Sequence, residues 1–236
     1  MKYMGSKNRI AKEILPIILK DRKPDQWYVE PFCGGCNIID KVEGNRMAND
    51  VNKYLIAFLE SLSQGWLPPE NITEEEYLKI KNNIDSYEEK IVGYVGFQLS
   101  FGAMWFSSYR KDSQGIRNYS REAFNNVKKQ SSKLRGIRFY NKNYWELEIP
   151  DNSIIYCDPP YEGTIQYKEN KKQFNYNQYW NWIREMSKKG HQIFCSEYDA
   201  PKDFECIWEK EIKNNISNKK KYEIRIEKLF VYNKKL

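Results

Sequence analysis

The sequence predicts an α/β fold in which a Rossmann-like sheet is interrupted by a helical insertion. Residues 27–30 form a strand pattern that is followed by a glycine turn, a helix from about residue 37, a second strand pattern and Asp50. This order is typical of nucleotide-binding sheets. The alternation then stops over residues 66–135, which read as several helices and one polar loop. Strand patterns resume over 137–140, 153–157, 192–195 and 225–232.

Length and composition are consistent with this organisation. A chain of 236 residues suits one domain with a large insertion, so we expect a catalytic domain from residues 1–65 and 136–236 and a separate segment over 66–135. The hydrophobic content of 40% and charged content of 30% indicate a globular protein. No apolar run is long enough to span a membrane and the first residues lack a signal-peptide pattern, so we expect a cytoplasmic protein, as a monomer.

The individual elements carry recognisable end signals. Ser6 is expected to cap a helix that runs to about Ile18 and is kinked at Pro16. Asp50 is expected to cap the helix that follows the second strand. A further helix is expected over 177–188, and the period-two pattern over 225–232 predicts a strand in an antiparallel pair.

The net charge of +7 is concentrated in one segment. Between Phe101 and Tyr140 there are nine basic residues against Asp112 and Glu122, so this segment accounts for the net charge of the whole chain. A basic segment with interleaved aromatic residues is typical of a surface that binds nucleic acid, although a solvated helix face has the same composition. The expected DNA contacts are Arg110, Lys111, Arg117, Arg121, Lys128 and Lys129. Arg110 and Arg117 flank a loop and are the candidates for reading bases.

A glycine motif and an acidic strand end predict a nucleotide site. The segment Glu30-Pro31-Phe32-Cys33-Gly34-Gly35 lies between a strand and a helix, where glycines allow a ligand to approach the backbone. Asp50, after the next strand, is placed to accept hydrogen bonds from ribose hydroxyls. A plain helix cap is the alternative role for Asp50.

The most specific motif is Asp158-Pro159-Pro160-Tyr161, directly after a buried strand. Its two prolines fix the backbone and lack N–H groups. We therefore expect the Asp158 carboxylate, the Pro159 carbonyl and the Tyr161 ring to face one point. Asp158 and the Pro159 carbonyl can accept both hydrogens of an exocyclic amine, which points the nitrogen lone pair at a methyl donor. Tyr161 can stack on the base. The predicted chemistry is direct methyl transfer by positioning and electrostatics, without a metal and with the base flipped out of the duplex.

At this point the chain resembles the Dam-type, alpha-group DNA adenine methyltransferases. Lys2 to Lys7 resembles their N-terminal signature, and the glycine motif, Asn49 to Asn52 and Asp158 to Tyr161 follow in the family's order. The resemblance implies a class I methyltransferase sheet, S-adenosylmethionine as cofactor and adenine in double-stranded DNA as substrate. It implies cofactor contacts from Tyr3, Lys7, Glu30, Phe32, Gly34, Gly35, Asp50, Asn143, Tyr144 and Asp158.

Two positions depart from the family pattern. Cys36 stands where a further glycine is usual, and Asn143 stands where an aspartate usually faces the cofactor's adenine. An amide oxygen can still accept a hydrogen bond from that adenine, so we expect cofactor binding to survive.

Other functions stay open on the sequence alone. Related proline motifs serve methylation of cytosine in DNA, adenine in RNA or a glutamine side chain. A DNA-binding module without turnover is a second alternative, and Cys36 and Asn143 favour it weakly. Cys33 and Cys36 form a C-x-x-C pair that suggests thiol-redox chemistry, but no second pair accompanies them and His191 is the only histidine, so we expect no zinc site.

Overall fold

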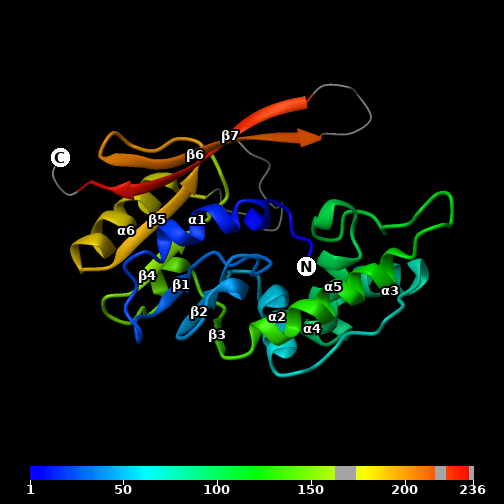
Figure 1. Cartoon of the computed structure of the whole chain (residues 1–236). Helices are drawn as coiled ribbons and strands as arrows, with labels where there is room; N and C mark the ends of the chain where they lie inside the picture. The colour runs from blue at the N-terminus through cyan, green and yellow to red at the C-terminus, as the bar shows by residue number, and fades with distance from the viewer. Residues whose placement is uncertain (163–173, 216–221, 234–236) are drawn as a thin grey trace. The chain divides into compact units, whose positions relative to one another are not determined.

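The computed structural model describes residues 1–162, 174–215 and 222–233, and the chain forms two compact units (Figure 1). Unit 1 contains Met1–Lys12 and Pro31–Glu148, and unit 2 contains Glu13–Glu30 and Ile149–Leu236. Both units combine helices with strands, which confirms the α/β class. The segment 66–135 lies entirely within unit 1.

Unit 1 joins a short parallel strand pair to a group of helices. The strands are β2 (Arg46–Asn49) and β3 (Ile137–Tyr140). The helices are α2 (Lys53–Ser63), α3 (Glu74–Asn82), α4 (Glu89–Gln98) and α5 (Tyr119–Leu134), the cyan and green coils of Figure 1. Helix α2 packs against both α4 and α5. The approach of α4 is close because Gly93 has no side chain: a Cβ there would lie 2.0 Å from the Tyr54 carbonyl oxygen.

Unit 2 holds a five-stranded mixed arrangement. Its strand order is β1 (Tyr28–Glu30), β4 (Ile154–Cys157), β5 (Gln192–Glu197), β7 (Tyr222–Tyr232) and β6 (Phe204–Asn215). The first three are parallel, and β7 runs antiparallel to both of its neighbours. All four residues of β4 are buried, as expected for a parallel strand covered on both faces. Helix α6 (Tyr176–Lys188) packs against β5.

The strands and α6 confirm the sequence pattern, whereas two end signals, at Ser6 and Asp50, were assigned wrongly. Ser6 caps a short 3₁₀ helix, Lys7–Arg9, and α1 (Ala11–Ile18) begins beyond it with Pro16 inside. Asp50 caps no helix: Asn52 does, by accepting a hydrogen bond from the Leu55 N–H at 3.0 Å. The carboxylate of Asp50 is thereby left for other partners.

Two elements differ from expectation. The helix expected from residue 37 is only a 3₁₀ turn, Ile39–Lys41, because the chain enters it from Cys36 in the left-handed region (φ 53°) and becomes extended again at Val42. Strand β6 was not anticipated, since it becomes a strand by pairing along β7. The basic run 219–221 lies outside the described residues.

The described residues contain neither a membrane-spanning helix nor a cluster of metal ligands. Within that part of the chain, no helix combines the length and the apolar character needed to cross a membrane. The same residues contain no group of three or more His, Cys, Asp or Glu side chains arranged to hold a metal ion.

Candidate functional site

The glycine loop of unit 1 is shaped by Tyr3. The loop is anchored where the Cys33 N–H donates to the Asn49 carbonyl at 2.8 Å. Gly34 has a φ of +45°, and a Cβ there would lie 2.6 Å from Tyr3 Cε1. A Cβ at Gly35 would lie 2.7 Å from Tyr3 Cβ. Both glycines are therefore required by the close approach of Tyr3, and the structure brings together three residues that the sequence predicted separately.

Asp50 lies beside this loop, at the carboxyl end of β2. Its Oδ2 accepts the Gly34 N–H at 3.2 Å and its Oδ1 accepts the Asn52 N–H at 3.0 Å. Burial raises the pKa of Asp50 above that of an ordinary carboxyl group, and the backbone N–H bonds oppose this rise. Each carboxylate oxygen has a second lone pair, so Asp50 can still accept hydrogen bonds from a diol.

Asn49 ties the glycine loop to the segment after β3. This fully buried side chain donates through Nδ2 to the carbonyls of Pro31 at 2.9 Å and Lys142 at 3.0 Å. Its Oδ1 accepts the Lys142 N–H at 3.0 Å. The sequence placed Asn49 inside a motif but assigned it no role, because the partners come from two distant segments.

The segment after β3 supplies an aromatic pair. The rings of Phe32 and Tyr144 lie with their centroids 5.1 Å apart. Asn143 begins a 3₁₀ turn, where its backbone N–H and its side-chain Nδ2 both donate to Glu146 Oε2, at 3.2 and 3.0 Å. The orientation of the Asn143 amide is thus set by Glu146. The structure thus brings together Phe32 and Tyr144, two residues that were each expected to contact the cofactor.

Lys7 and Cys36 complete the predicted residues of this part. Lys7 is buried, and its Nζ donates to the Gly5 carbonyl at 3.1 Å. Cys36 is fully buried and adopts a φ of 53°, a conformation that glycine reaches without strain. The glycine that the resemblance leads us to expect at this position would adopt this angle without strain, and Cys36 adopts the same angle.

Unit 2 gathers carboxylates at the ends of three neighbouring parallel strands. Glu30 ends β1, Asp158 follows β4 and Glu197 ends β5, so all three lie at the carboxyl edge, where α/β sheets bind their ligands. Glu30 is buried and accepts the Tyr28 hydroxyl at 2.9 Å. The motif of Asp158 is therefore flanked on both sides by an acidic strand end.

Glu197 holds the chain just after the proline motif. Its Oε2 accepts the Glu162 N–H at 3.3 Å and its Oε1 accepts the Tyr198 N–H at 2.8 Å. This buried carboxylate thus connects the end of β5 to the residue that follows Tyr161. The sequence predicts the strand that Glu197 ends but not this contact.

The two carbonyls of the proline motif differ in their hydrogen bonding among the described residues. The Pro160 carbonyl accepts the Tyr176 hydroxyl at 3.1 Å. Among the described residues, no N–H or O–H donates to the carbonyl of Pro159, which is the acceptor that the sequence predicted. Asp158 is partly exposed beside it.

Tyr161 is fixed by two residues that the sequence did not predict. Its hydroxyl donates to Glu227 Oε2 at 3.0 Å, and its ring meets Tyr198 edge-on with centroids 4.7 Å apart. Burial raises the pKa of Tyr161, and the nearby Asp158 and Glu227 carboxylates raise it further. The phenol therefore stays neutral and continues to donate. Glu227 was detectable only as one face of the alternating pattern of β7.

The two arginines expected to read bases share partners within unit 1. Arg117 forms a two-pronged ion pair with Glu122, at 2.8 and 2.9 Å, and Arg110 lies 3.6 Å from the same carboxylate. Both guanidinium groups lie over the ring of Tyr119, at 3.9 Å for Arg110 and 4.8 Å for Arg117. The Arg110 side chain is 13% exposed and that of Arg117 is 54% exposed, so Arg117 is the more accessible.

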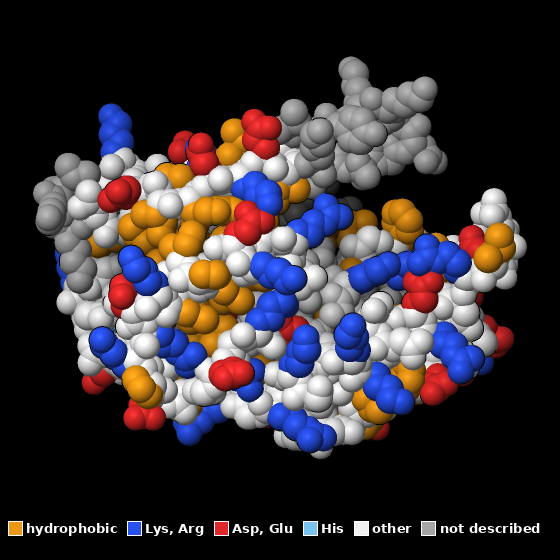
Figure 2. Space-filling model, in the orientation of Figure 1, with side chains coloured by type: hydrophobic (Ala, Val, Ile, Leu, Met, Phe, Trp, Pro, Cys, Tyr) orange, Lys and Arg blue, Asp and Glu red, His pale blue; other side chains and the backbone are white. Residues whose placement is uncertain are grey.

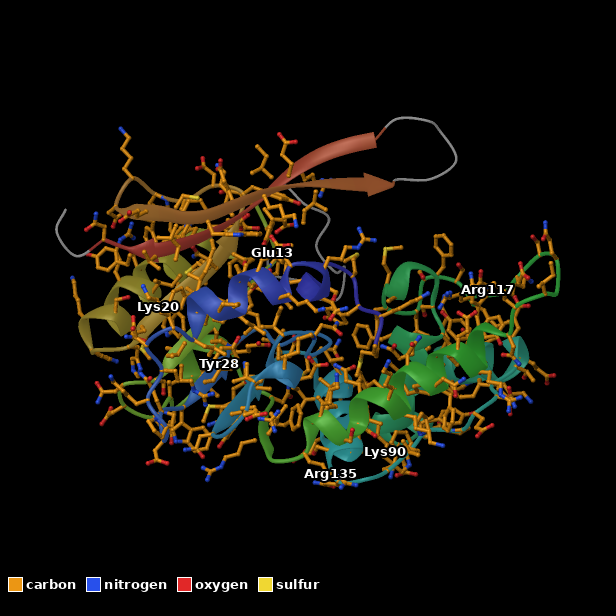
Figure 3. The ribbon with its side chains drawn as sticks, in the orientation of Figure 1. Glu13, Lys20, Tyr28, Lys90, Arg117 and Arg135 are labelled. Carbon is orange, nitrogen blue, oxygen red and sulfur yellow. The ribbon has the colours of Figure 1, made fainter. Side chains whose placement is uncertain are left out.

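Helix α5 carries three of the four other expected DNA contacts on its exposed face, and the fourth, Lys111, precedes the helix. Arg121, Lys128 and Lys129 are exposed, and Lys111 is engaged by Glu74 at 2.9 Å. In the described part of the chain, Arg121 and Lys129 form no ion pair. Figure 2 shows Lys and Arg side chains spread over the face where α5 lies, and Figure 3 labels Arg117 and Arg135, just before and just after this helix.

Comparison with known proteins places these residues in a family context. The model of the D12 class N6 adenine-specific DNA methyltransferases matches residues 3–224. The DNA adenine methylases of two Vibrio cholerae serotype O1 strains, classical Ogawa 395 and El Tor Inaba N16961, are each 24% identical over 181 residues. Each match covers 68% of this chain, which spans 64% of the length of these relatives.

Solved structures give more distant matches. SMU.472 complexed with SAH has a TM-score of 0.40 and 11% identity, and the match covers 96% of this chain and 52% of that one. The rRNA methyltransferase AviRa from Streptomyces viridochromogenes has a TM-score of 0.46 and 10% identity, with 98% and 87% covered.

Proposed function

The chain belongs to the D12 class of N6 adenine-specific DNA methyltransferases, and from this premise we propose that it transfers a methyl group from S-adenosylmethionine to the 6-amino group of adenine in double-stranded DNA. The observation that carries the proposal is the Asp158-Pro159-Pro160-Tyr161 motif at the carboxyl end of β4. The carboxylate and the Pro159 carbonyl form an acceptor pair suited to an aromatic amine.

Unit 1 fits the cofactor. Asp50 would hold the ribose hydroxyls, the Phe32–Tyr144 pair would line the adenine, and Tyr3 with the glycine loop would bound the methionine end. The buried Asn37 Nδ2 next to Gly35 has no hydrogen-bond partner among the described residues, which supports a polar ligand at this loop. When bound, S-adenosylmethionine supplies an electrophilic methyl group on a sulfonium.

Asp158 and Pro159 would prepare the nucleophile. The lone pair of an adenine amine is delocalised into the ring, so the nitrogen is a weak nucleophile. If the Asp158 carboxylate and the Pro159 carbonyl accept its two hydrogens, the nitrogen becomes tetrahedral and its lone pair becomes available. As the nitrogen–methyl bond forms and the methyl–sulfur bond breaks, S-adenosylhomocysteine would be released as a neutral thioether. The same carboxylate would stabilise the positive charge on the nitrogen until the N–H proton passes to solvent. Catalysis then depends on preorganised acceptors.

Tyr161 would bound the flipped base. An adenine inside a duplex cannot reach Asp158, so it must leave the stack. The Tyr161 ring is already held by Glu227 and Tyr198, so little side-chain freedom is lost when a base stacks on it. This rigidity supports the stacking role that the sequence predicted.

We propose that the segment 66–135 selects the DNA site, with the exposed basic face of α5 binding phosphates. Changing Lys128 and Lys129 to glutamate should weaken DNA binding and reduce the slope of log K against log salt concentration by about two. The reason is that each neutralised phosphate releases counterions. The measurement is duplex binding by fluorescence anisotropy from low to moderate salt.

Lys188 and Lys189 provide the matched control. They are also adjacent, exposed lysines, here at the end of α6, so the same double reversal changes the net charge equally. It should lower affinity slightly and leave the slope unchanged. Equal slopes for wild type and the Lys128/Lys129 variant would mean that this face of α5 does not contact DNA.

The proposed function is tested by sequencing modified bases in DNA from cells that express the protein. We expect N6-methyladenine at one recurrent sequence. The same experiment with Arg110→Ala and Arg117→Ala tests base readout, because a base-reading arginine changes which sequence is methylated whereas a phosphate contact lowers all sites alike. Uniform loss in both variants would move specificity to another part of the insertion.

A further inference from the structure

A buried glutamine interrupts the apolar face of α5. The helix packs through Ala123, Phe124, Val127 and Leu134, all of which are buried. Gln130 lies on the same face, three residues after Val127 and four before Leu134, and is 4% exposed. An apolar residue would fill this position without any need for partners, whereas a buried amide needs hydrogen bonds.

The amide of Gln130 is directed at the glycine loop. Its Nε2 lies 3.1 Å from the Gly35 carbonyl, 3.2 Å from the Cys36 carbonyl and 3.0 Å from Asp40 Oδ2. Its Oε1 accepts the α-amino group of Met1 at 2.5 Å. Two amide hydrogens are thus shared among three acceptors, all of them in or directly after the loop.

These contacts lie on both sides of the strained residue of the loop. Cys36 is the non-glycine residue with a φ of 53°, and the Gly35 and Cys36 carbonyls belong to the peptide units before and after it. Backbone in this region persists when surrounding groups determine it. Gln130 binds both peptide units and therefore fixes the loop at this point.

We propose that Gln130 is a positioning residue that holds the glycine loop in its cofactor-binding shape. This inference rests on the proposed function, because it takes the loop to be the cofactor site. Lys128 and Lys129, the two residues before Gln130 in the same helix, are exposed. The helix that carries the proposed phosphate contacts is therefore bonded directly to the cofactor loop.

The inference is tested by titrating S-adenosylhomocysteine into wild-type protein and the variants Gln130→Met and Gln130→Leu by calorimetry. Both substitutions place an apolar side chain of similar size at this position and remove the Nε2 donor. We expect cofactor affinity to fall about ten-fold or more, and the KM for S-adenosylmethionine to rise by a similar factor while kcat changes little.

Ser120→Ala is the matched control. Ser120 is buried on the same helix, accepts the Ile72 N–H at 2.9 Å and donates to the Glu70 carbonyl at 3.3 Å, but none of its hydrogen bonds reaches the loop. This variant should lose stability in urea and bind S-adenosylhomocysteine as wild type does. If Gln130→Met also bound as wild type does, the inference would be overturned while the proposed function stood.

A ligand-free readout separates the two claims. If wild-type protein bound no S-adenosylhomocysteine, the proposed function would fail, and amide hydrogen exchange of Cys36 and Asn37 would then decide the role of Gln130. Faster exchange at these amides in Gln130→Met than in Ser120→Ala supports the inference. Equal exchange in the two variants overturns it.

Discussion

Replacing Asp158 by alanine is expected to slow methyl transfer on the order of a hundred- to a thousand-fold, because one of the two preorganised acceptors at the reacting amine is removed. Binding of DNA and of S-adenosylmethionine should change little, since the proposed phosphate contacts and the proposed ribose contact lie elsewhere in the chain. Single-turnover kinetics with saturating cofactor measure the chemical step directly.

Asp151→Ala is the control for this variant. Asp151 is an exposed carboxylate shortly before β4, so its removal makes the same change of charge at the other end of the strand that leads to Asp158. It should leave turnover unchanged. Turnover within a few-fold of wild type for Asp158→Ala would exclude this carboxylate from the catalytic role.

Replacing Asp50 by alanine is expected to weaken S-adenosylmethionine binding on the order of a hundred-fold, because two hydrogen bonds to a charged acceptor would be lost. Stability should suffer less than affinity. Burial raises the folded-state pKa of Asp50, so its ionisation opposes folding as the pH rises above the unfolded carboxyl pKa, and removing the charge relieves that cost at neutral pH. Calorimetry and thermal unfolding of the same samples give both quantities.

Asp50→Asn separates the ribose contact from the loop contacts. Its remaining oxygen can accept one of the N–H groups of Gly34 or Asn52, while the second charged acceptor is lost. Its affinity should fall between wild type and Asp50→Ala. Equal affinity in all three proteins would show that Asp50 only supports the loop.

Local signals predicted most of the fold. The strands β1 to β5 were readable because short apolar runs are bounded by glycine, proline or acidic residues, and β7 was readable from its period of two. Local signals gave wrong or no predictions where the structure of a segment depends on partners that are distant in the sequence. Asp50 looks like a helix cap in sequence, but the Gly34 N–H, sixteen residues away, draws it to the loop. Strand β6 has no clear pattern of its own and depends on pairing with β7.

Sequence motifs indicate the residues proposed for the candidate site, but they do not indicate the residues that hold these in place. The glycines, Asp50 and Asp158 carry motifs that specify chemistry. Asn49 and Gln130 act through partners up to 129 residues away in the chain, so no local pattern marks them. One feature of the sequence does indicate Gln130: it is a polar residue on an otherwise apolar helix face. Such a residue suggests a buried hydrogen-bond network.

The most direct test of the account is the chemical identity of the product. Purified protein is incubated with duplex DNA and S-adenosylmethionine that carries an isotopically labelled methyl group, and the DNA is digested to nucleosides for mass spectrometry. The account predicts label in N6-methyldeoxyadenosine from wild type and at most a trace from Asp158→Ala. Label in a methylated cytosine, or no label in DNA from wild-type protein, would contradict it.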